Sequence, residues 1–145
     1  MKHLIPILLL TFSIQAQVIK VKNENGVLFM PIKINGVLKI EAMLDTGAAE
    51  CNIPPCVANT LIRTNTLLVP EHLLSSKIYT LADGSTQECR RFMIKSLRIG
   101  NKTIYNVECS VSKNDNAPIL IGGSALKKLK VIKIDYKNNI ITIPK

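Results

Sequence analysis

The sequence predicts a mainly β domain, a small closed or nearly closed β-barrel. The 145 residues fit one domain. Runs of β-branched residues are separated by turn dipeptides such as Asn25-Gly26 and Asp83-Gly84. Few segments have a helical pattern. A hydrophobic fraction of 47% with 20% charged residues is sufficient for a packed core and too apolar for a disordered chain.

Turn signals divide the chain into five predicted β-hairpins. Asn25-Gly26, Asn35-Gly36 and Asp83-Gly84 suit the left-handed geometry of tight turns. The predicted strand pairs are 18–22 with 27–34, 27–34 with 37–44, 78–81 with 86–92, 94–99 with 103–111, and 131–135 with 140–143. Because short turns join these strands, we expect a meandering antiparallel sheet.

Three short segments have a helical pattern, at residues 57–62, 71–75 and 124–129. In the last of them, Ser124 is placed as an N-cap before the sequence Ala-Leu-Lys-Lys-Leu. The prediction is therefore a β domain with one short helix in its C-terminal half and two less regular helical stretches before it.

The first sixteen residues are typical of a secretory signal peptide. A basic start at Lys2 and His3 precedes an apolar stretch at 4–12, and the small residue Ala16 ends the segment. The stretch is too short to span a bilayer, and no Cys follows to accept a lipid. We expect cleavage before Gln17, a folded domain at 17–145, and an exported protein, periplasmic or secreted, with no integral membrane segment. The alternative is a buried N-terminal strand or helix.

Four cysteines follow this segment, an even number that permits two disulfides in an oxidising compartment. They are Cys51, Cys56, Cys89 and Cys109. Three connectivities are open, and one of them pairs Cys51 with Cys56 and Cys89 with Cys109 across a predicted hairpin. The chain has no CxxC pair, and His72 is the single histidine after residue 16. We therefore expect no metal and no cofactor.

The chain is basic, with 19 Lys and Arg against 10 Asp and Glu and a formal net charge of +9. The basic residues are scattered, and only 4% of residues are aromatic. This pattern indicates that the charge serves to keep the protein solvated and to give weak electrostatic steering, and we expect no nucleic-acid partner. Adhesion to an anionic lipid or polysaccharide is an alternative that salt would weaken.

An acidic side chain follows directly on an apolar strand end. The strand at 42–44 runs into Asp45, Thr46, Gly47 and Ala48. Burial of a charged carboxylate costs several kcal/mol unless the group is paired. The Asp45 carboxylate is therefore either well hydrogen-bonded or part of a functional site. Gly47 allows a tight turn, and Thr46 supplies a short hydroxyl. The alternative is a strand-ending turn without further function.

A second signal is the apolar run at 119–121 that ends in Gly122 and Gly123. Taken alone it indicates a strand-to-helix turn. With the Asp45 motif and the hairpin around Asp83, it resembles the retropepsin-like aspartic proteases, in particular their exported bacterial members. The resemblance extends over residues 30–143. It implies a small closed barrel-like unit, two copies of which form one active site.

The resemblance also implies roles for individual residues. Asp45 would be the catalytic aspartate, in an active-site loop completed by Thr46, Gly47 and Ala48. Thr46 would supply the hydroxyl that holds two such loops together, and the backbone of Gly47 would contact the substrate. The flap would have its tip at Leu81, Ala82, Asp83 and Gly84, and the segment Ile121, Gly122 and Gly123 would support the catalytic loop from behind.

Aspartic proteolysis uses two carboxylates that share one proton and activate a water molecule. This chain has a single Asp-Thr-Gly motif, so Asp45 needs a second copy of the chain. The sequence therefore predicts a homodimeric aspartic endopeptidase acting on peptides or proteins. The alternative is a non-catalytic peptide-binding module of the cell envelope, because Ala49 stands where many relatives carry Ser or Thr.

Overall fold

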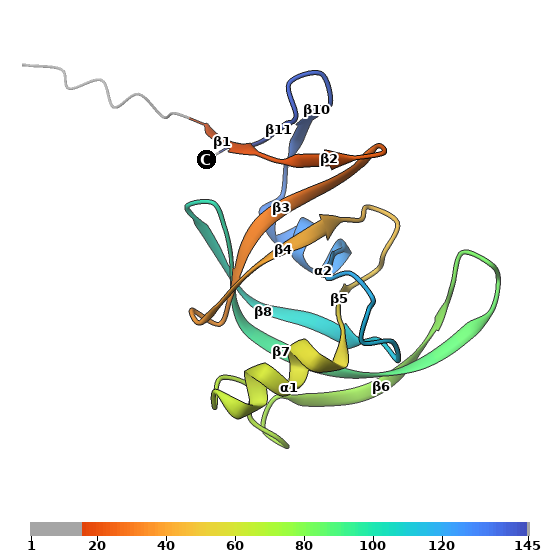
Figure 1. The fold of residues 1–145 in the computed structure, drawn as a ribbon. Helices are drawn as coiled ribbons and strands as arrows, with labels where there is room; N and C mark the ends of the chain where they lie inside the picture. Colours follow the sequence, from red (N-terminus) through yellow and green to blue (C-terminus); the bar gives the residue numbers. More distant parts are fainter. Residues whose placement is uncertain (1–15, 145) are drawn as a thin grey trace, which may run out of the picture.

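The computed structural model describes residues 16–144, so the predicted signal segment lies outside the described residues except for Ala16. The elements are β1 (Gln17–Lys20), β2 (Lys22–Glu24), β3 (Val27–Ile34), β4 (Leu38–Leu44), β5 (Cys51–Ile53), α1 (Pro55–Arg63), β6 (Leu73–Thr80), β7 (Thr86–Ile99), β8 (Lys102–Val111), β9 (Leu120–Ile121), α2 (Gly123–Leu129), β10 (Lys133–Asp135) and β11 (Ile140–Ile143). The protein is mainly β, as predicted (Figure 1).

The strands form two sheets. One has the order β1-β11-β10, and the other has the order β2-β3-β4-β9-β5-β8-β7-β6. Strand β3 also pairs with β7, so the larger sheet folds back around its apolar face. Strands β2 and β6 still end that sheet, and the three-stranded sheet is separate. The expectation of a closed barrel is therefore wrong in this respect.

A hairpin forms at each of the five predicted turns, although only Lys22 of the predicted strand 18–22 belongs to the first. Both dipeptides Asn25-Gly26 and Asn35-Gly36 have the left-handed backbone that was predicted. Asn25 and Asn35 have φ values of 53° and 48°, and Gly26 and Gly36 have values of 87° and 72°. These left-handed conformations are costly for most residues, but Asn and Gly adopt them readily. Local turn chemistry therefore determines where the chain reverses.

The expectation of a purely antiparallel meander is wrong, because β4 pairs with β9 and β5 with β8 in parallel. The predicted strand 18–22 is also split at Val21, since β1 pairs with β11 while β2 pairs with β3. Residues 86–99 form one strand, where two were predicted. The segment 71–75 is not a helix, because Leu73 and Leu74 pair with β7. One short apolar turn cannot nucleate a helix against such pairing.

Both remaining helices form, at α1 and α2. Helix α1 starts with Pro55 at its first turn, where a missing N–H costs nothing. Gly122, not Ser124, is the N-cap of α2. The Ser124 hydroxyl instead accepts a hydrogen bond from the Cys51 N–H at 2.9 Å and donates to the Glu108 carbonyl at 2.7 Å. It thus ties α2 to β5 and β8.

The core lies between the folded-back faces of the larger sheet and the two helices. Its most buried side chains include Ile53, Leu61, Leu67, Ile99 and Val107. Ala125 is also fully buried, so a small residue suits the contact between α2 and the sheet. Within residues 16–144, no helix has the length and apolar character needed to cross a membrane.

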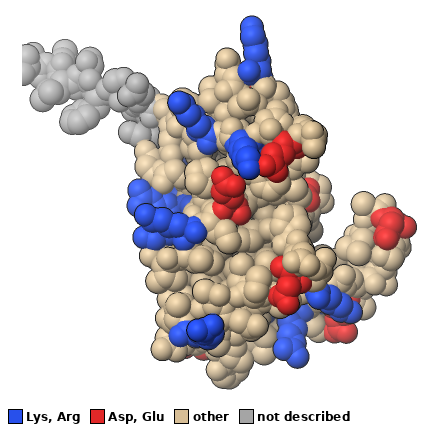
Figure 2. Space-filling view, viewed as in Figure 1, with Lys and Arg blue, Asp and Glu red and all other residues tan. Residues whose placement is uncertain are grey.

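Charged side chains are distributed over the surface. On the face shown in Figure 2, Lys and Arg lie in several separate groups with acidic residues among them. The hairpin of β6 and β7 projects from the body (Figure 1). In the space-filling view, a hollow separates the end of this projection from the rest of the molecule (Figure 2). This hollow is where the candidate site lies.

Candidate active site

Asp45 lies at the end of β4, in a loop that the backbone holds firmly. Its N–H donates to the Ile121 carbonyl at 3.1 Å, which extends the pairing of β4 with β9 by one residue. Its Oδ1 accepts hydrogen bonds from the N–H groups of Gly47 at 2.9 Å and Ala48 at 3.1 Å. The half-buried carboxylate is therefore oriented by two backbone N–H groups of its own loop, and the Asp45 backbone is fixed by the bond to Ile121.

Two glycines pack directly under this loop. The Gly123 N–H donates to the Ala48 carbonyl at 2.8 Å. A Cβ at Gly123 would lie 2.7 Å from the Ala49 carbonyl oxygen, and one at Gly122 would lie 2.9 Å from that of Ala48. Gly122 has φ −105°, which any residue adopts, so its small size is needed for space and not for conformation. The segment that was predicted to lie behind the loop of Asp45 is therefore in contact with that loop.

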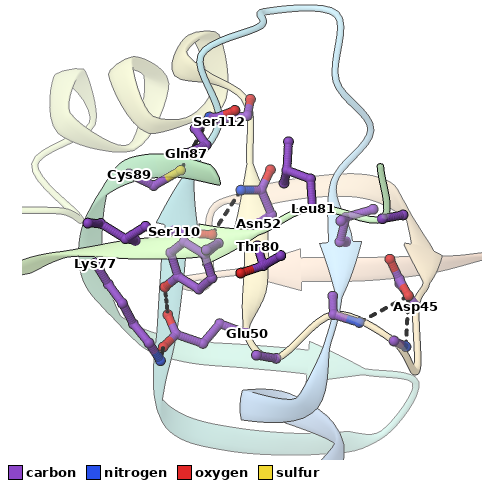
Figure 3. A pocket seen from close by; sticks show the side chains of 17 residues that line it. Asp45, Glu50, Asn52, Lys77, Thr80, Leu81, Gln87, Cys89, Ser110 and Ser112 are labelled. Atoms are coloured by element: carbon purple, nitrogen blue, oxygen red, sulfur yellow. Dashed lines mark hydrogen bonds and ion pairs between the residues drawn. The ribbon is translucent and has the colours of Figure 1, made fainter. Parts of the chain in front are cut away.

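A cleft of about 650 Å³ runs beside Asp45 and under the β6–β7 hairpin (Figure 3). Gly47 and Ala48 line it from the catalytic loop, and Leu81 and Ala82 line it from the hairpin. Thr46, Asp83, Gly84, Ile121, Gly122 and Gly123 lie outside this lining, as far as residues 16–144 define it. The cleft therefore lies between the loop that carries Asp45 and the hairpin.

The hairpin turn is built by its own side chains. Asp83 accepts hydrogen bonds from the N–H of Ser85 at 2.9 Å and from its hydroxyl at 2.6 Å. These bonds lower the pKa of the exposed Asp83 carboxyl. Gly84 has φ +81°, and the Leu81 N–H donates to the Ser85 carbonyl. Asp83 therefore stabilises the turn, and it is not among the residues that line the cleft.

A buried carboxylate, Glu50, lies in the same cleft five residues after Asp45. Its Oε2 accepts hydrogen bonds from the Tyr79 hydroxyl at 2.6 Å and from Arg91 Nε at 2.9 Å. Its Oε1 accepts from Arg91 Nη2 at 2.9 Å and from Lys77 Nζ at 3.2 Å. Arg91 also pairs with Glu108. The side chains of Glu50 and Lys77 meet at one side of the cleft (Figure 3). The Tyr79 side chain joins them through its hydroxyl.

These contacts shift the pKa values of the group. Burial raises the pKa of Glu50, but hydrogen bonds from Arg91, Tyr79 and Lys77 outweigh this effect and bring the pKa below its usual value. Burial and the Glu50 carboxylate raise the pKa of Tyr79, and the hydrogen bond to Glu50 raises that of Arg91. Glu50 is therefore ionised near neutral pH and compensated by two cations.

Cys51 and Cys109 are register neighbours on the parallel strands β5 and β8, and both are buried. Burial raises the pKa of each thiol. Cys89 is also buried, whereas Cys56 is exposed on α1. All four thiols are free, and Phe92, not Cys89, lies opposite Cys109. The pairings Cys51–Cys56 and Cys89–Cys109 are therefore not formed.

Among residues 16–144, no group of three or more His, Cys, Asp or Glu side chains is placed to hold a metal ion. Within the described part of the chain, Asp45 has no cationic partner, whereas Glu50 binds both Lys77 and Arg91.

Comparison with known proteins agrees with this arrangement. Residues 30–128 match the family described as "gag-polyprotein putative aspartyl protease". The chain belongs to this family. A crystal structure of a retropepsin-like aspartic protease from Rickettsia conorii is similar with a TM-score of 0.63 and 24% sequence identity, covering 90% of this chain and 99% of that one. This likeness shows the retropepsin-like fold. No curated protein sequence matches the chain.

The family and the fold support a protease function. The matched region contains Asp45, the β6–β7 hairpin and the double glycine, the three features on which sequence reasoning relied. That reasoning missed Glu50, Tyr79, Lys77 and Arg91 as a group. A signal was available in part, because Glu50 is an acidic residue between Ala49 and the apolar strand at Cys51–Ile53. Its partner Arg91 is 41 residues away, and nothing local indicates the pair.

Proposed function

We propose that this protein is an aspartic endopeptidase whose active site combines Asp45 of one chain with Asp45 of a second copy. The observation that carries the proposal is the position of Asp45: it lies at the edge of a cleft, under a projecting hairpin, and backbone N–H groups orient it. Each chain supplies one carboxylate of this kind. A two-fold axis through the site would supply the second.

The reaction follows from two carboxylates that share one proton. The ionised carboxylate takes a proton from a water molecule, and the water oxygen attacks the carbonyl carbon of the scissile peptide bond. The protonated carboxylate donates to the carbonyl oxygen, so a tetrahedral diol forms without a charged oxygen. Return of a proton to the nitrogen breaks the C–N bond and releases an amine and a carboxylic acid. No covalent enzyme intermediate is required.

The β6–β7 hairpin supports a peptide substrate for this chemistry. An extended peptide laid in the cleft could form backbone hydrogen bonds with the hairpin on one side and with the catalytic loop on the other. Closure of the hairpin over the peptide would also exclude water from the reacting atoms. The apolar side chain of Leu81 at the cleft is 44% exposed, which leaves it available for contact with substrate.

The test is hydrolysis of an unstructured peptide library by the purified protein, with Asp45→Asn beside it. Asp45→Asn removes the shared proton, so we expect a loss of at least about 10³-fold in kcat/KM with folding unchanged. Asp135→Asn is the matched control, because Asp135 lies on β10 outside the cleft and its carboxylate accepts hydrogen bonds from the nearby turn residue Asn138. Sedimentation of the same samples reports whether the active species is a dimer.

Activity retained in Asp45→Asn would refute the proposal. Peptide binding without cleavage by the wild-type protein, at concentrations where it is dimeric, would favour the peptide-binding module instead.

A further inference from the structure

We propose that Glu50 is a positioning residue that fastens the β6–β7 hairpin to the catalytic loop and so sets the height of the hairpin over the cleft. The inference rests on the proposed function, because it concerns how the same site receives a peptide. It starts from a carboxylate whose side chain is only 6% exposed and has four hydrogen bonds.

The donors to Glu50 come from both arms of the hairpin. Lys77 and Tyr79 lie on β6 and Arg91 lies on β7. Tyr79 is two residues from Leu81, where the turn begins, so the tether is close to the end that covers the cleft. One carboxylate therefore holds the two strands of the hairpin together and holds both to the loop that carries Asp45.

Stability alone does not account for this group. A buried ion pair is often no more stabilising than apolar side chains of the same volume, because both ions lose their hydration. The charged group instead fixes the relative orientation of the side chains that it joins. Arg91 binds Glu50 through two nitrogens, at 2.9 Å each, and a bidentate contact of this kind defines the relative orientation of both side chains.

The other end of Glu50 is held equally firmly. Its backbone carbonyl packs on Gly122, the residue under the catalytic loop, and Cys51 next to it is bonded to the Ser124 hydroxyl. The carboxylate thus projects from a rigid base, and Arg91 lies at the foot of the hairpin, where β7 pairs with Ser110 of β8. The part of the hairpin that can move is the part beyond Arg91, which Lys77 and Tyr79 join to Glu50. Without the tether, the hairpin would spend more time away from the cleft. Part of the binding free energy of a peptide would then be needed to return the hairpin to its place.

This predicts a specific kinetic effect. If only a fraction of the molecules has the hairpin in place, the apparent affinity for peptide falls by that fraction while the chemistry of bound peptide is unchanged. Loss of the tether should therefore raise KM with kcat almost constant. A variant that merely unfolds in part would lower kcat, through fewer active molecules, with KM constant. The two explanations are separable in one experiment.

The experiment compares Tyr79→Phe and Glu50→Gln with wild type, and uses Tyr105→Phe and Glu41→Gln as matched controls. Tyr105 is 63% exposed on β8, and Glu41 is exposed on β4. Hydrogen exchange is measured over the β6–β7 hairpin, and KM and kcat are measured with a cleaved peptide. We expect exchange of residues 77–81 to be about tenfold faster in Tyr79→Phe, with KM raised by up to the same factor, depending on the fraction of hairpin still in place, and with the controls unchanged.

Unchanged exchange in both Tyr79→Phe and Glu50→Gln overturns the inference, and so does faster exchange with an unchanged KM. These results leave the peptidase proposal standing if wild type cleaves peptide. If wild type binds peptide without cutting it, the peptidase proposal fails, and Kd replaces KM in the same comparison. Wild-type protein that neither cuts nor binds peptide overturns both.

Discussion

The substitution Gly122→Ala tests whether the catalytic loop depends on close backbone packing. An added Cβ would lie 2.7 Å from the Glu50 carbonyl carbon and 2.9 Å from the Ala48 carbonyl oxygen, and closer still to the Glu50 carbonyl oxygen. Carbon atoms in contact normally lie about 3.5–4.0 Å apart, so the loop must move by about 1 Å. The neighbours are backbone atoms, and no side-chain rotation can relieve the contact.

The movement reaches Asp45 because the Ala48 N–H donates to its carboxylate. A misplacement of about 1 Å at a catalytic centre costs on the order of 10²-fold in rate. The same overpacking destabilises a core by about 1–3 kcal/mol, which lowers Tm by roughly 3–10 °C in a chain of this size. The assay is kcat/KM for peptide hydrolysis together with thermal unfolding followed by circular dichroism.

Gly36→Ala is the matched control for this change. Gly36 has φ +72° and nothing within 4 Å of a built Cβ, so it loses only backbone freedom. A left-handed alanine costs about 1–2 kcal/mol, which is comparable in stability, but Gly36 is in the β3–β4 turn and does not touch the loop. We expect normal kcat/KM in this variant. The reasoning is refuted if Gly122→Ala keeps kcat/KM within about threefold of wild type.

Two further predictions concern the thiols and acid stability. Cys56 is the exposed cysteine, so one thiol per native chain should react quickly with a thiol reagent, and this reaction should be lost in Cys56→Ser. The three buried thiols, Cys51, Cys89 and Cys109, should react only on unfolding, and fast reaction of any of them would contradict the packing. Because the folded pKa of Glu50 lies below its unfolded value near 4.5, its stabilisation is complete above that pH and is lost as the pH falls through the folded pKa. Tm should therefore decline below about pH 4.5 more steeply in wild type than in Glu50→Gln, with Glu41→Gln following wild type; parallel Tm curves for wild type and Glu50→Gln would show that Glu50 is not the group concerned.

The features that the sequence predicted well are those that depend on neighbouring residues. Asn25-Gly26, Asn35-Gly36 and Asp83-Gly84 each require a turn, and the turns formed where expected. The order of the Asp45 motif, the hairpin and the double glycine was sufficient to indicate the family. In each case the physical cause lies within a few residues, so a local pattern carries it.

The features that were missed depend on residues far apart in the chain. Val18 and Lys22 look like parts of one strand, but Val18 pairs with Thr142 in one sheet and Lys22 with Phe29 in the other. The parallel pairing of β5 with β8 brings Cys51 beside Cys109, 58 positions later, and no local signal distinguishes that partner from Cys56 or Cys89. Tertiary pairing selected among strands whose local preferences were equal.

The contacts in the site are likewise of two kinds, those between neighbouring residues and those between residues far apart in the chain. Asp45 is oriented from below by contacts within a short motif and by glycines chosen for their size, which a sequence comparison detects easily. The hairpin above it is aligned by hydrogen bonds that Tyr79 and Arg91, 29 and 41 residues away, donate to Glu50. A chain can therefore keep the motif and the fold while losing the second set of contacts. Because both sets meet in residues 48–50, this segment, more than the Asp-Thr-Gly triplet alone, determines how the carboxylate and the hairpin face one another.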